Sequence, residues 1–357
     1  MRRHQIAVIP GDGIGKEVTP EGIRVLERAA EISGSFTLEL ESFPWGCDYY
    51  GEHGRMMAAD GLEVLREFDA IYFGAVGDPA VPDHVSLRGL RLPICQGFDQ
   101  YVCLRPSTLL PGVRSPLDGK SPEGIDFVVI RENTEGEYSG AGGNAHRGLA
   151  HEVAVETAVF SRMGIERVVR YAFALAESRS RTLVSATKSN AQQYGMTLWD
   201  EVVESVGADH PDVAVERVLI DALAARFVLD PESLDVVVAS NLFGDILTDL
   251  GAAICGSLGI APSGNINPEG DYPSMFEPVH GSAPDIVGRG IANPLGMIRT
   301  GAMMLEHLGE SGSAELIAGA VRAFTSEGGA FTPDLGGATR TAKVTDEVVR
   351  CMEELAG

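Results

Sequence analysis

The chain contains no stretch of 18 uncharged apolar residues, so we expect no membrane-spanning helix. We also expect no signal peptide, because Met1–His4 leads directly into the strand-like segment Gln5–Ile9. Cysteine is scarce: the 5 cysteines are scattered and form no Cys-x-x-Cys pair. Such unpaired thiols are typical of a reducing compartment, and we predict a cytoplasmic protein.

Positively charged residues are also few. The 28 Lys and Arg residues face 51 Asp and Glu residues, which gives a formal net charge of −23. This surface would repel the phosphates of a nucleic acid, and no basic patch offsets it, so we predict no nucleic-acid partner. A small anionic substrate needs locally concentrated positive charge instead, and several arginines do gather between Arg88 and Arg131.

Apolar residues are plentiful and occur in a regular alternation of patterns. A chain of 357 residues with 44% hydrophobic content can bury a large core, and its length favours two domains. Strand-like runs alternate with helical patterns, which predicts an α/β protein whose sheet is covered on both faces. The clearest strands are Ile6–Ile9, Ala70–Ala75, Phe127–Ile130, Leu183–Ala186 and Val236–Ala239, and the clearest helices are Arg162–Ser178 and Thr345–Leu355.

The Gly-rich stretch Glu135–Gly148 fits neither pattern. It follows a buried strand, so it leaves the core, either as a hairpin arm that reaches a partner subunit or as a plain surface loop. Composition alone favours the loop.

A second Gly-rich stretch, Pro10–Gly15, follows the first strand. Its Gly-x-Gly-x-Gly spacing differs from the dinucleotide fingerprint, and no acidic residue ends a second strand in the expected context. The usual Rossmann topology is therefore not predicted. We expect a tight turn that leaves the amides of Gly15 and Lys16 free near a ligand.

Two acidic residues follow the apolar run Val236–Ala239. With a helix starting at Gly244, Asp245 and Asp249 project from one face, because they lie four residues apart. Their mutual repulsion would be relieved by a cation, and oxygen ligands suit Mg²⁺ or Mn²⁺. The alternative is that the helix dipole favours Asp245 and that Asp249 is simply solvated.

Long motifs spread over the chain resemble the β-decarboxylating dehydrogenases of 2-hydroxy acids, the family of isocitrate and isopropylmalate dehydrogenases. They are Arg131–Tyr138, Thr187–Asn190, Ile220–Asp221, Ser240–Asp249 and Glu277–Ile286. Trp45–Tyr50, Asp69–Gly77 and Phe98–Tyr101 are most similar to the tartrate/D-malate dehydrogenase branch. The resemblance runs from about residue 5 to the C-terminal helix.

This resemblance implies a two-domain α/β fold of the isopropylmalate-dehydrogenase type. Residues 1–104 and 256–357 would form the cofactor-binding domain. Residues 105–255 would bind substrate and dimerise, with an arm near 135–156. The resemblance also implies a homodimer whose active sites are shared between subunits.

The implied activity is the oxidative decarboxylation of a malate-like 2-hydroxy diacid with NAD and Mg²⁺ or Mn²⁺. D-malate or tartrate is the best guess; the alternatives are 3-isopropylmalate or another 3-substituted malate, possibly with an extra acidic group. Two hypotheses from other functional classes are a non-catalytic regulatory subunit and a metal-free Rossmann dehydrogenase. Decarboxylation of the 2-oxo acid needs an electron sink, which a divalent Lewis acid provides, and then a proton donor at carbon 3.

The resemblance assigns these roles to individual residues. Asp245 and Asp249 would hold the metal together with the partner subunit's Asp221. Lys188, also acting across the dimer, matches the catalytic base, and Tyr138 matches the proton donor.

Other matched residues would bind the substrate and the cofactor. Arg105 and Arg131 match the arginines that grip the substrate carboxylates. The cofactor residues would be His280, Gly281, Ser282, Ala283, Asp285 and Ile286 around adenosine, Asn293 near adenine and Asn190 near nicotinamide. Asp285 favours NAD, because a carboxylate would repel a 2′-phosphate; alternatively it only caps a turn after Pro284.

The sequence departs from the family at Cys95, where relatives have a third arginine. Pro93 and Gly97 weaken the helix expected there. Arg91 or Arg88 could fold in as a replacement and bind substrate, the substrate could differ, or both arginines could be solvated. This departure leaves the exact substrate open.

Overall fold

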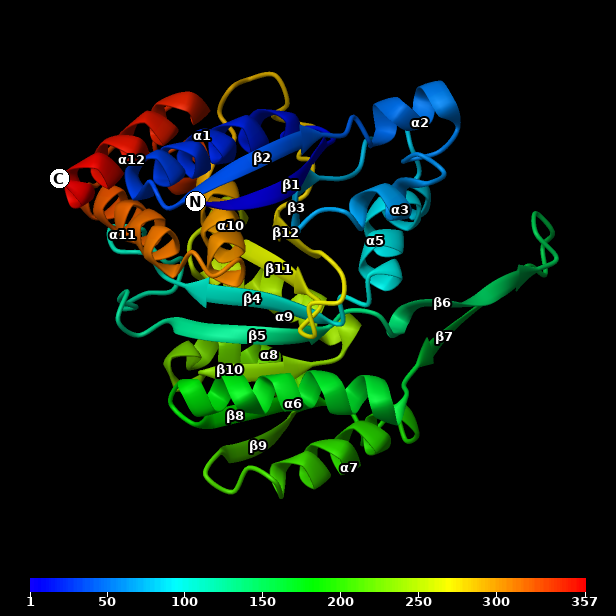
Figure 1. Ribbon diagram of the computed structural model, residues 1–357. Coiled ribbons are helices and arrows are strands. Elements are labelled where there is room, and N and C mark those ends of the chain that lie inside the picture. The colour runs from blue at the N-terminus through cyan, green and yellow to red at the C-terminus, as the bar shows by residue number, and fades with distance from the viewer.

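A ten-stranded mixed sheet forms the centre of the molecule, as a computed structural model of all 357 residues shows (Figure 1). Its strand order is β2-β1-β3-β12-β11-β4-β5-β10-β8-β9. The strands are β1 (Arg2–Gly11), β2 (Phe36–Ser42), β3 (Ala70–Ala75), β4 (Val102–Thr108), β5 (Asp126–Glu132), β8 (Thr182–Thr187), β9 (Ala214–Leu219), β10 (Val236–Ala239), β11 (Pro262–Ile266) and β12 (Ser274–Pro278). The predicted strands Ala70–Ala75 and Val236–Ala239 coincide with β3 and β10, and the other predicted strands lie within observed ones.

Helices cover both halves of this sheet (Figure 1). They are α1 (Gly15–Ser33), α2 (Cys47–His53), α3 (Gly61–Leu65), α4 (Asp83–Ser86), α5 (Leu92–Gly97), α6 (Arg162–Ser178), α7 (Gly195–Gly207), α8 (Ile220–Leu229), α9 (Asn241–Ile254), α10 (Leu295–His307), α11 (Ser311–Glu327) and α12 (Thr341–Ala356). In Figure 1, α1, α10, α11 and α12 group on the half that holds β1, whereas α6 and α7 lie on the half that holds β8. The α/β prediction is confirmed. None of the helices is both long and apolar enough to cross a membrane.

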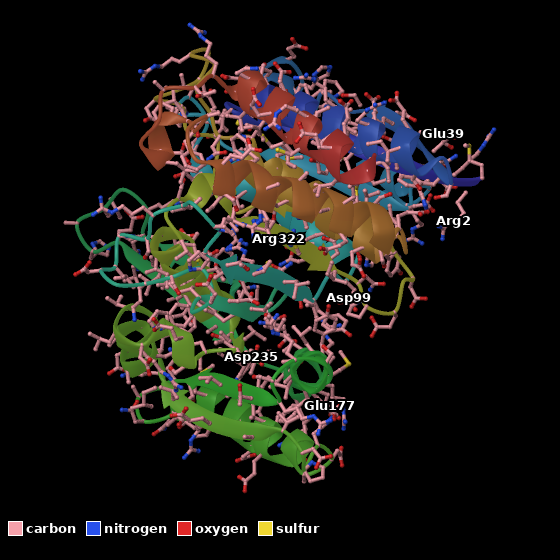
Figure 2. The ribbon with its side chains drawn as sticks, turned by 90° about the vertical axis from the view of Figure 1, so that its left-hand side faces the viewer. Arg2, Glu39, Asp99, Glu177, Asp235 and Arg322 are labelled. Carbon is pink, nitrogen blue, oxygen red and sulfur yellow. The ribbon has the colours of Figure 1, made fainter.

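The two halves of the sheet run in opposite directions. β4 is antiparallel to both β5 and β11, and β11 is antiparallel to β12, whereas the outer pairs on each side are parallel. In Figure 2, Glu39 of β2 lies in the upper part of the molecule and Glu177 of α6 lies in the lower part. The carboxyl ends of β5, β10, β8 and β9 meet at one edge of the sheet.

The Gly-rich stretch after β5 forms a separate hairpin. β6 (Gly136–Ala145) pairs antiparallel with β7 (Val153–Val159), and the hairpin projects from the body in Figure 1. Val153 and Val155 are exposed on it.

Two local expectations are wrong. The helix that carries Asp245 begins at Asn241, one turn before Gly244, because the Gly244 amide already donates to Ser240 O. The amides of Gly15 and Lys16 are not free, because they donate to the carbonyls of Asp12 and Gly13.

Candidate active site

Asp245 is the point at which three side chains from separate elements converge. Its Oδ1 accepts hydrogen bonds from Arg131 Nη1 and, at 3.2 Å, from Arg105 Nη1. Its Oδ2 accepts a hydrogen bond of 2.9 Å from the Tyr138 hydroxyl. Arg105 comes from β4, Arg131 from β5 and Tyr138 from β6, so the site lies where the hairpin leaves the sheet.

Both arginines are buried and fixed by further contacts. Arg131 is 2% exposed, and its Nε and Nη2 donate to Asn241 Oδ1 at 3.1 and 2.7 Å. Arg105 Nη1 also donates to Thr248 Oγ1 at 2.7 Å. Two guanidinium groups held side by side, with a single carboxylate between them, leave positive charge available to an anion.

The ionisation of the acidic pair follows from these neighbours. Burial by itself would raise the pKa of Asp245, but Arg131 and Arg105 outweigh burial and lower it to about 2. The pKa of Asp249 is raised, because nearby protein atoms exclude part of its hydration and Asp245 is negatively charged. Burial and Asp245 also raise the pKa of Tyr138, so this hydroxyl keeps its proton at neutral pH.

The acidic pair fits a divalent cation, although one chain does not complete a site. Asp245 and Asp249 lie one turn apart on α9. Burial, with a smaller part from the Asp245 charge, raises the pKa of Asp249, and a cation nearby would favour its ionised form. Both donors are carboxylate oxygens, as Mg²⁺ and Mn²⁺ prefer. No group of three or more His, Cys, Asp or Glu side chains within the chain is arranged to hold a metal. Any metal bound by Asp245 and Asp249 would take its remaining ligands from a partner subunit, the substrate or water.

Lys188 and Asp221 pair with each other, away from Asp245 in the same chain. Lys188 Nζ lies 2.6 Å from Asp221 Oδ1, and this hydrogen bond lowers the pKa of Asp221. Lys188 follows β8 and Asp221 stands in the first turn of α8, at the same edge of the sheet as Asp245. No hydrogen bond or ion pair joins either of them to Asp245.

Arg91, and not Arg88, folds into the interior. Arg91 is 7% exposed; its Nε lies 2.7 Å from Glu277 Oε1 and its Nη2 lies 3.2 Å from Asn265 Oδ1. Burial alone would lower the pKa of Arg91, but the Glu277 carboxylate outweighs it and raises that pKa above its usual value. Cys95, one turn further along, is completely buried.

Arg88 lies on the opposite side of the same segment. A π-helical turn, Leu87–Arg91, widens the helix and separates the directions of the two arginines. Arg88 is exposed, with Nη2 3.9 Å from Glu156 Oε1 on β7. Its Nη1 would lie 2.8 Å from a Cβ atom added at Gly140, so Arg88 contacts the hairpin.

The predicted cofactor segment lies against the turn Gly11–Gly15. Ser282 O accepts a hydrogen bond of 2.9 Å from the Ile14 amide, and a Cβ at Gly13 would come within 2.1 Å of Ser282 O. His280 is 8% exposed, and its Nε2 is buried without a hydrogen-bond partner. Burial lowers the pKa of His280, so its ring is neutral. Because Nδ1 donates to the Gly281 carbonyl at 3.0 Å, Nε2 carries no proton and can accept a hydrogen bond from a ligand.

The remaining cofactor residues are placed as follows. Asp285 is exposed and makes no ion pair, which leaves its carboxylate free for hydroxyl donors; Gly281 is exposed, whereas Ala283 and Ile286 are half-buried. Asn293 is buried, with Nδ2 3.0 Å from Asp334 Oδ2. Asn190 is exposed, on the other half of the sheet from this loop.

Other polar residues take part in the site although the sequence assigned them no role. Asn241 orients Arg131, and Glu277 holds Arg91. Asn265 connects this pair to Asn133, whose Nδ2 donates to Asn265 Oδ1 at 3.0 Å. Asn241, Glu277 and Asn133 lie inside the matched motifs, so position in a motif was the available signal; for Asn265 there was none.

Known proteins are similar to this chain over almost its whole length. The sequence profile of the isocitrate/isopropylmalate dehydrogenase family matches residues 5–349. A probable tartrate dehydrogenase/decarboxylase of Agrobacterium vitis is 55% identical over 349 residues, which cover 98% of this chain and 97% of that protein. The D-malate dehydrogenase (decarboxylating) of Escherichia coli is 54% identical over 358 residues, with 98% and 99% covered.

A solved structure agrees with these sequence relationships. The isocitrate dehydrogenase of Methylococcus capsulatus superposes with a TM-score of 0.87 at 32% identity, over 98% of this chain and 99% of that one. The predicted isopropylmalate-dehydrogenase-like fold is thereby confirmed. The sequence matches extend over almost the whole length of the chain, and they show that it belongs to the isocitrate/isopropylmalate dehydrogenase family.

Proposed function

We propose that the protein oxidises and decarboxylates a malate-like 2-hydroxy diacid, D-malate or tartrate, with NAD and Mg²⁺ or Mn²⁺. The observation that carries the proposal is the convergence of Arg105, Arg131 and Tyr138 on Asp245. The names of the 54–55% identical relatives support the substrate class.

The arginines bind and orient the diacid. Arg105 and Arg131 receive a carboxylate by charge-assisted hydrogen bonds, each worth about 1.5–3 kcal/mol. Arg91 lies near this pair and would contact the substrate from the side of Glu277; Arg88 would do so only if it left the hairpin. Because each guanidinium is fixed by protein contacts, the substrate is held in one orientation.

The proposed reaction consists of two proton transfers, one hydride transfer and the loss of carbon dioxide. The partner subunit's Lys188 would accept the proton of the 2-hydroxyl, and bound NAD⁺ would take up the hydride from carbon 2, which gives a 2-oxo acid. Asp245 and Asp249, together with the partner subunit's Asp221, would hold the divalent ion, which would supply a Lewis acid for the decarboxylation. As the bond to CO₂ breaks, its electron pair would stay on the substrate as an enolate, and Tyr138 Oη would donate its proton to carbon 3.

The cofactor preference rests on Asp285. Its free carboxylate can accept hydrogen bonds from both ribose hydroxyls of NAD and would repel the 2′-phosphate of NADP. His280 Nε2, buried and unpartnered, is the second observation that favours a ligand at this loop. Gly281, Ser282, Ala283 and Ile286 would surround the adenosine, with Asn293 at the adenine and Asn190 at the nicotinamide.

The division into domains and the dimer belong to the same proposal. Residues 1–104 and 256–357 bind the cofactor, and residues 105–255 bind substrate and dimerise through the hairpin near 135–156. The exposed Val153 and Val155 support burial of this hairpin by a partner. The Lys188–Asp221 pair then enters the partner's site, which would explain why it does not reach Asp245 of its own chain.

Two other functions can be weighed against this one. A 3-substituted malate, such as 3-isopropylmalate, remains an alternative because Cys95 replaces an arginine and only Arg91 folds inward. A non-catalytic regulatory subunit is disfavoured, because Lys188, Tyr138, Asp221, Asp245 and Asp249 are all present.

A substrate panel tests the proposal. NADH formation is followed by absorbance with Mn²⁺ and NAD⁺ on D-malate, both tartrates, isopropylmalate, isocitrate and homoisocitrate, with and without EDTA. We expect EDTA-sensitive turnover of D-malate or a tartrate. Turnover of isopropylmalate alone would replace the substrate assignment, and turnover that EDTA leaves unchanged would overturn the metal dependence.

A further inference from the structure

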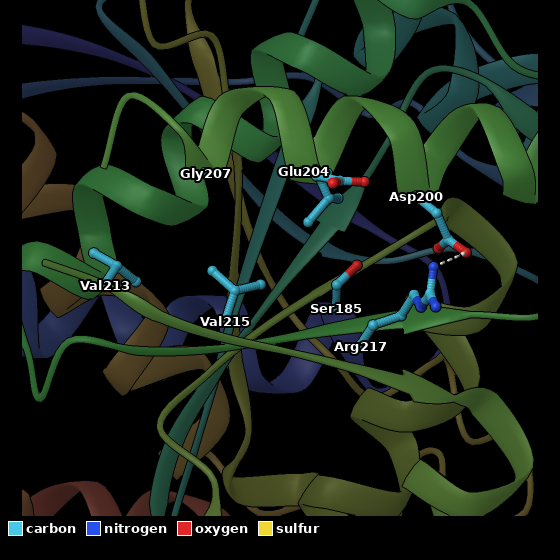
Figure 3. Close-up of a pocket in the computed structure, with 8 residues that line it drawn as sticks. Ser185, Asp200, Glu204, Gly207, Val213, Val215 and Arg217 are labelled. Atoms are coloured by element: carbon cyan, nitrogen blue, oxygen red, sulfur yellow. Dashed lines mark hydrogen bonds and ion pairs between the residues drawn. The ribbon is translucent and has the colours of Figure 1, made fainter. Parts of the chain in front are cut away.

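A cavity of about 460 Å³ lies between α7 and the edge strand β9, and none of its lining residues belongs to the active site (Figure 3). Along α7, Asp200, Val203, Glu204 and Gly207 recur at helical spacing and form one wall. The opposite wall comes from Ser185 of β8, from Val215 and Arg217 of β9, and from Val213, which directly precedes β9.

One carboxylate oxygen of Asp200 has no hydrogen-bond donor at this cavity. Its side chain is 9% exposed, and its Oδ2 accepts a hydrogen bond of 3.2 Å from Arg217 Nη1. Its Oδ1 is buried and has no partner. In Figure 3 the Asp200 carboxylate points from α7 toward Arg217 and the cavity. A buried carboxylate oxygen without a donor is costly, so a ligand that donates a hydrogen bond here gains affinity.

Two further groups extend this polar end. Ser185 is completely buried, and its Oγ accepts a hydrogen bond of 3.0 Å from Trp199 Nε1, which leaves its second lone pair free. Glu204 lies one helical turn after Asp200 and makes no ion pair in the chain. Two carboxylates against the single Arg217 guanidinium give this end of the cavity a net negative charge.

The rest of the wall is apolar. Val203 and Val213 are buried, and Val215 of β9 is 41% exposed toward solvent. This wall does not suit a hydrated metal ion, because valines supply no oxygen ligands. It does not suit an anion either, because Asp200 Oδ1 and Glu204 would repel it. A neutral apolar molecule would leave Asp200 Oδ1 without a donor.

We propose that this cavity binds a small primary alkylammonium compound. Its –NH₃⁺ group donates to Asp200 Oδ1, Ser185 Oγ and Glu204, and its carbon chain covers Val203, Val213 and Val215. The site is independent of the proposed dehydrogenase activity, so a binding experiment without turnover tests it.

Trp199 gives the site its own optical reporter. It is one of 2 tryptophans in the chain, so the emission of full-length Trp45→Phe protein reports on the cavity wall. This protein is titrated with n-butylammonium chloride at constant ionic strength, with n-butanol and KCl in parallel. We expect a saturable change in Trp199 emission and a rise in Tm with n-butylammonium alone.

Charge variants decide which group binds the ammonium. Asp200→Asn should weaken binding by about tenfold or more, whereas Glu201→Gln, an exposed neighbour that pairs with Arg162, should leave it unchanged. Should Asp200→Asn fail to fold, the exposed Glu204→Gln should weaken binding severalfold. Equal responses to n-butanol or KCl, equal affinity in the Asp200 or Glu204 variant, or no saturable response would each overturn the proposal.

Discussion

Gly244 lies directly against Arg131: a Cβ atom added at Gly244 would come within 2.6 Å of both Cβ and Cγ of Arg131. The glycine lets α9 approach β5 closely enough for Arg131 to reach Asn241 and Asp245 at once. The missing side chain at Gly244 therefore sets the geometry of the anion-binding pair.

We expect Gly244→Ala to lower the free energy of unfolding by about 1–3 kcal/mol, because α9 must move away from Arg131. Activity should fall together with stability, since Asp245 moves with the helix. Thermal unfolding and NADH formation measure the two effects. Gly312→Ala is the matched control: nothing lies near its added Cβ in α11, so it should be neutral or stabilise by up to about 1 kcal/mol. Equal behaviour of the two variants would contradict the close-contact argument.

Mixed dimers test whether active sites are shared. Tyr138→Phe removes the proton donor and Lys188→Ala the base, so each homodimer should lose about 10²–10⁴-fold in kcat. A heterodimer of the two, isolated with two different tags, restores one intact site and should recover about half of the wild-type activity.

Tyr194→Phe supplies the control for these dimers. Tyr194 is 82% exposed, so its variant should behave as wild type. Heterodimers as inactive as their parents would place both groups in the same subunit's site and refute the shared arrangement.

Asp285 should decide between the two nicotinamide cofactors. Asp285→Lys exchanges a repulsion for an attraction toward the 2′-phosphate, so the ratio of kcat/KM for NAD to that for NADP should fall by about tenfold or more. Asp285→Asn, which only removes the charge, should give a smaller change in the same direction. Because Asp285 is exposed, its substitution should not disturb folding, so a changed cofactor ratio would report on cofactor binding. An unchanged ratio in both variants would mean that the carboxylate does not face the ribose.

Asp245 should contribute a pH-dependent part of the stability. Its pKa is about 2 in the folded protein, below the ordinary value of 3.8, so the ionised form stabilises the fold above about pH 4. This contribution is lost as pH falls toward about 2. Because 35% of the side chain is exposed, we expect only about 1 kcal/mol. Urea unfolding of wild type and Asp245→Asn should show their difference in free energy of unfolding narrowing by that amount between about pH 5 and pH 2. A constant difference would contradict the ion-pair account.

The buried parts of the fold could be predicted from the sequence, and the edges could not. Val236–Ala239 and Ala70–Ala75 are apolar throughout because both faces of β10 and β3 are covered. The edge strand β9 contains Glu216 and Arg217 and is mostly exposed, so its apolar pattern is broken. The predicted start of α9 at Gly244 is wrong, because this glycine serves close packing inside the helix and does not mark its boundary.

The site could be predicted only in part for a related reason. Arg91 and Glu277 are 186 residues apart, and no local pattern connects them. The choice between Arg88 and Arg91 depends on the direction that the π-helical turn gives each side chain, which spacing does not reveal. The roles of Arg105, Arg131 and Tyr138 came from the family resemblance, and they stay predictions until variants are measured.

The strand order also fixes the sequence of events during synthesis on the ribosome. β12 and β11 lie between β3 and β4, yet they are made after all the other strands of the sheet. Until Pro278 has left the ribosome, β1–β3 and the β4–β5 pair are separate half-sheets with bare edges. The late hairpin joins these two parts, so a nascent chain interrupted before Pro262 lacks the strands that connect its two half-sheets.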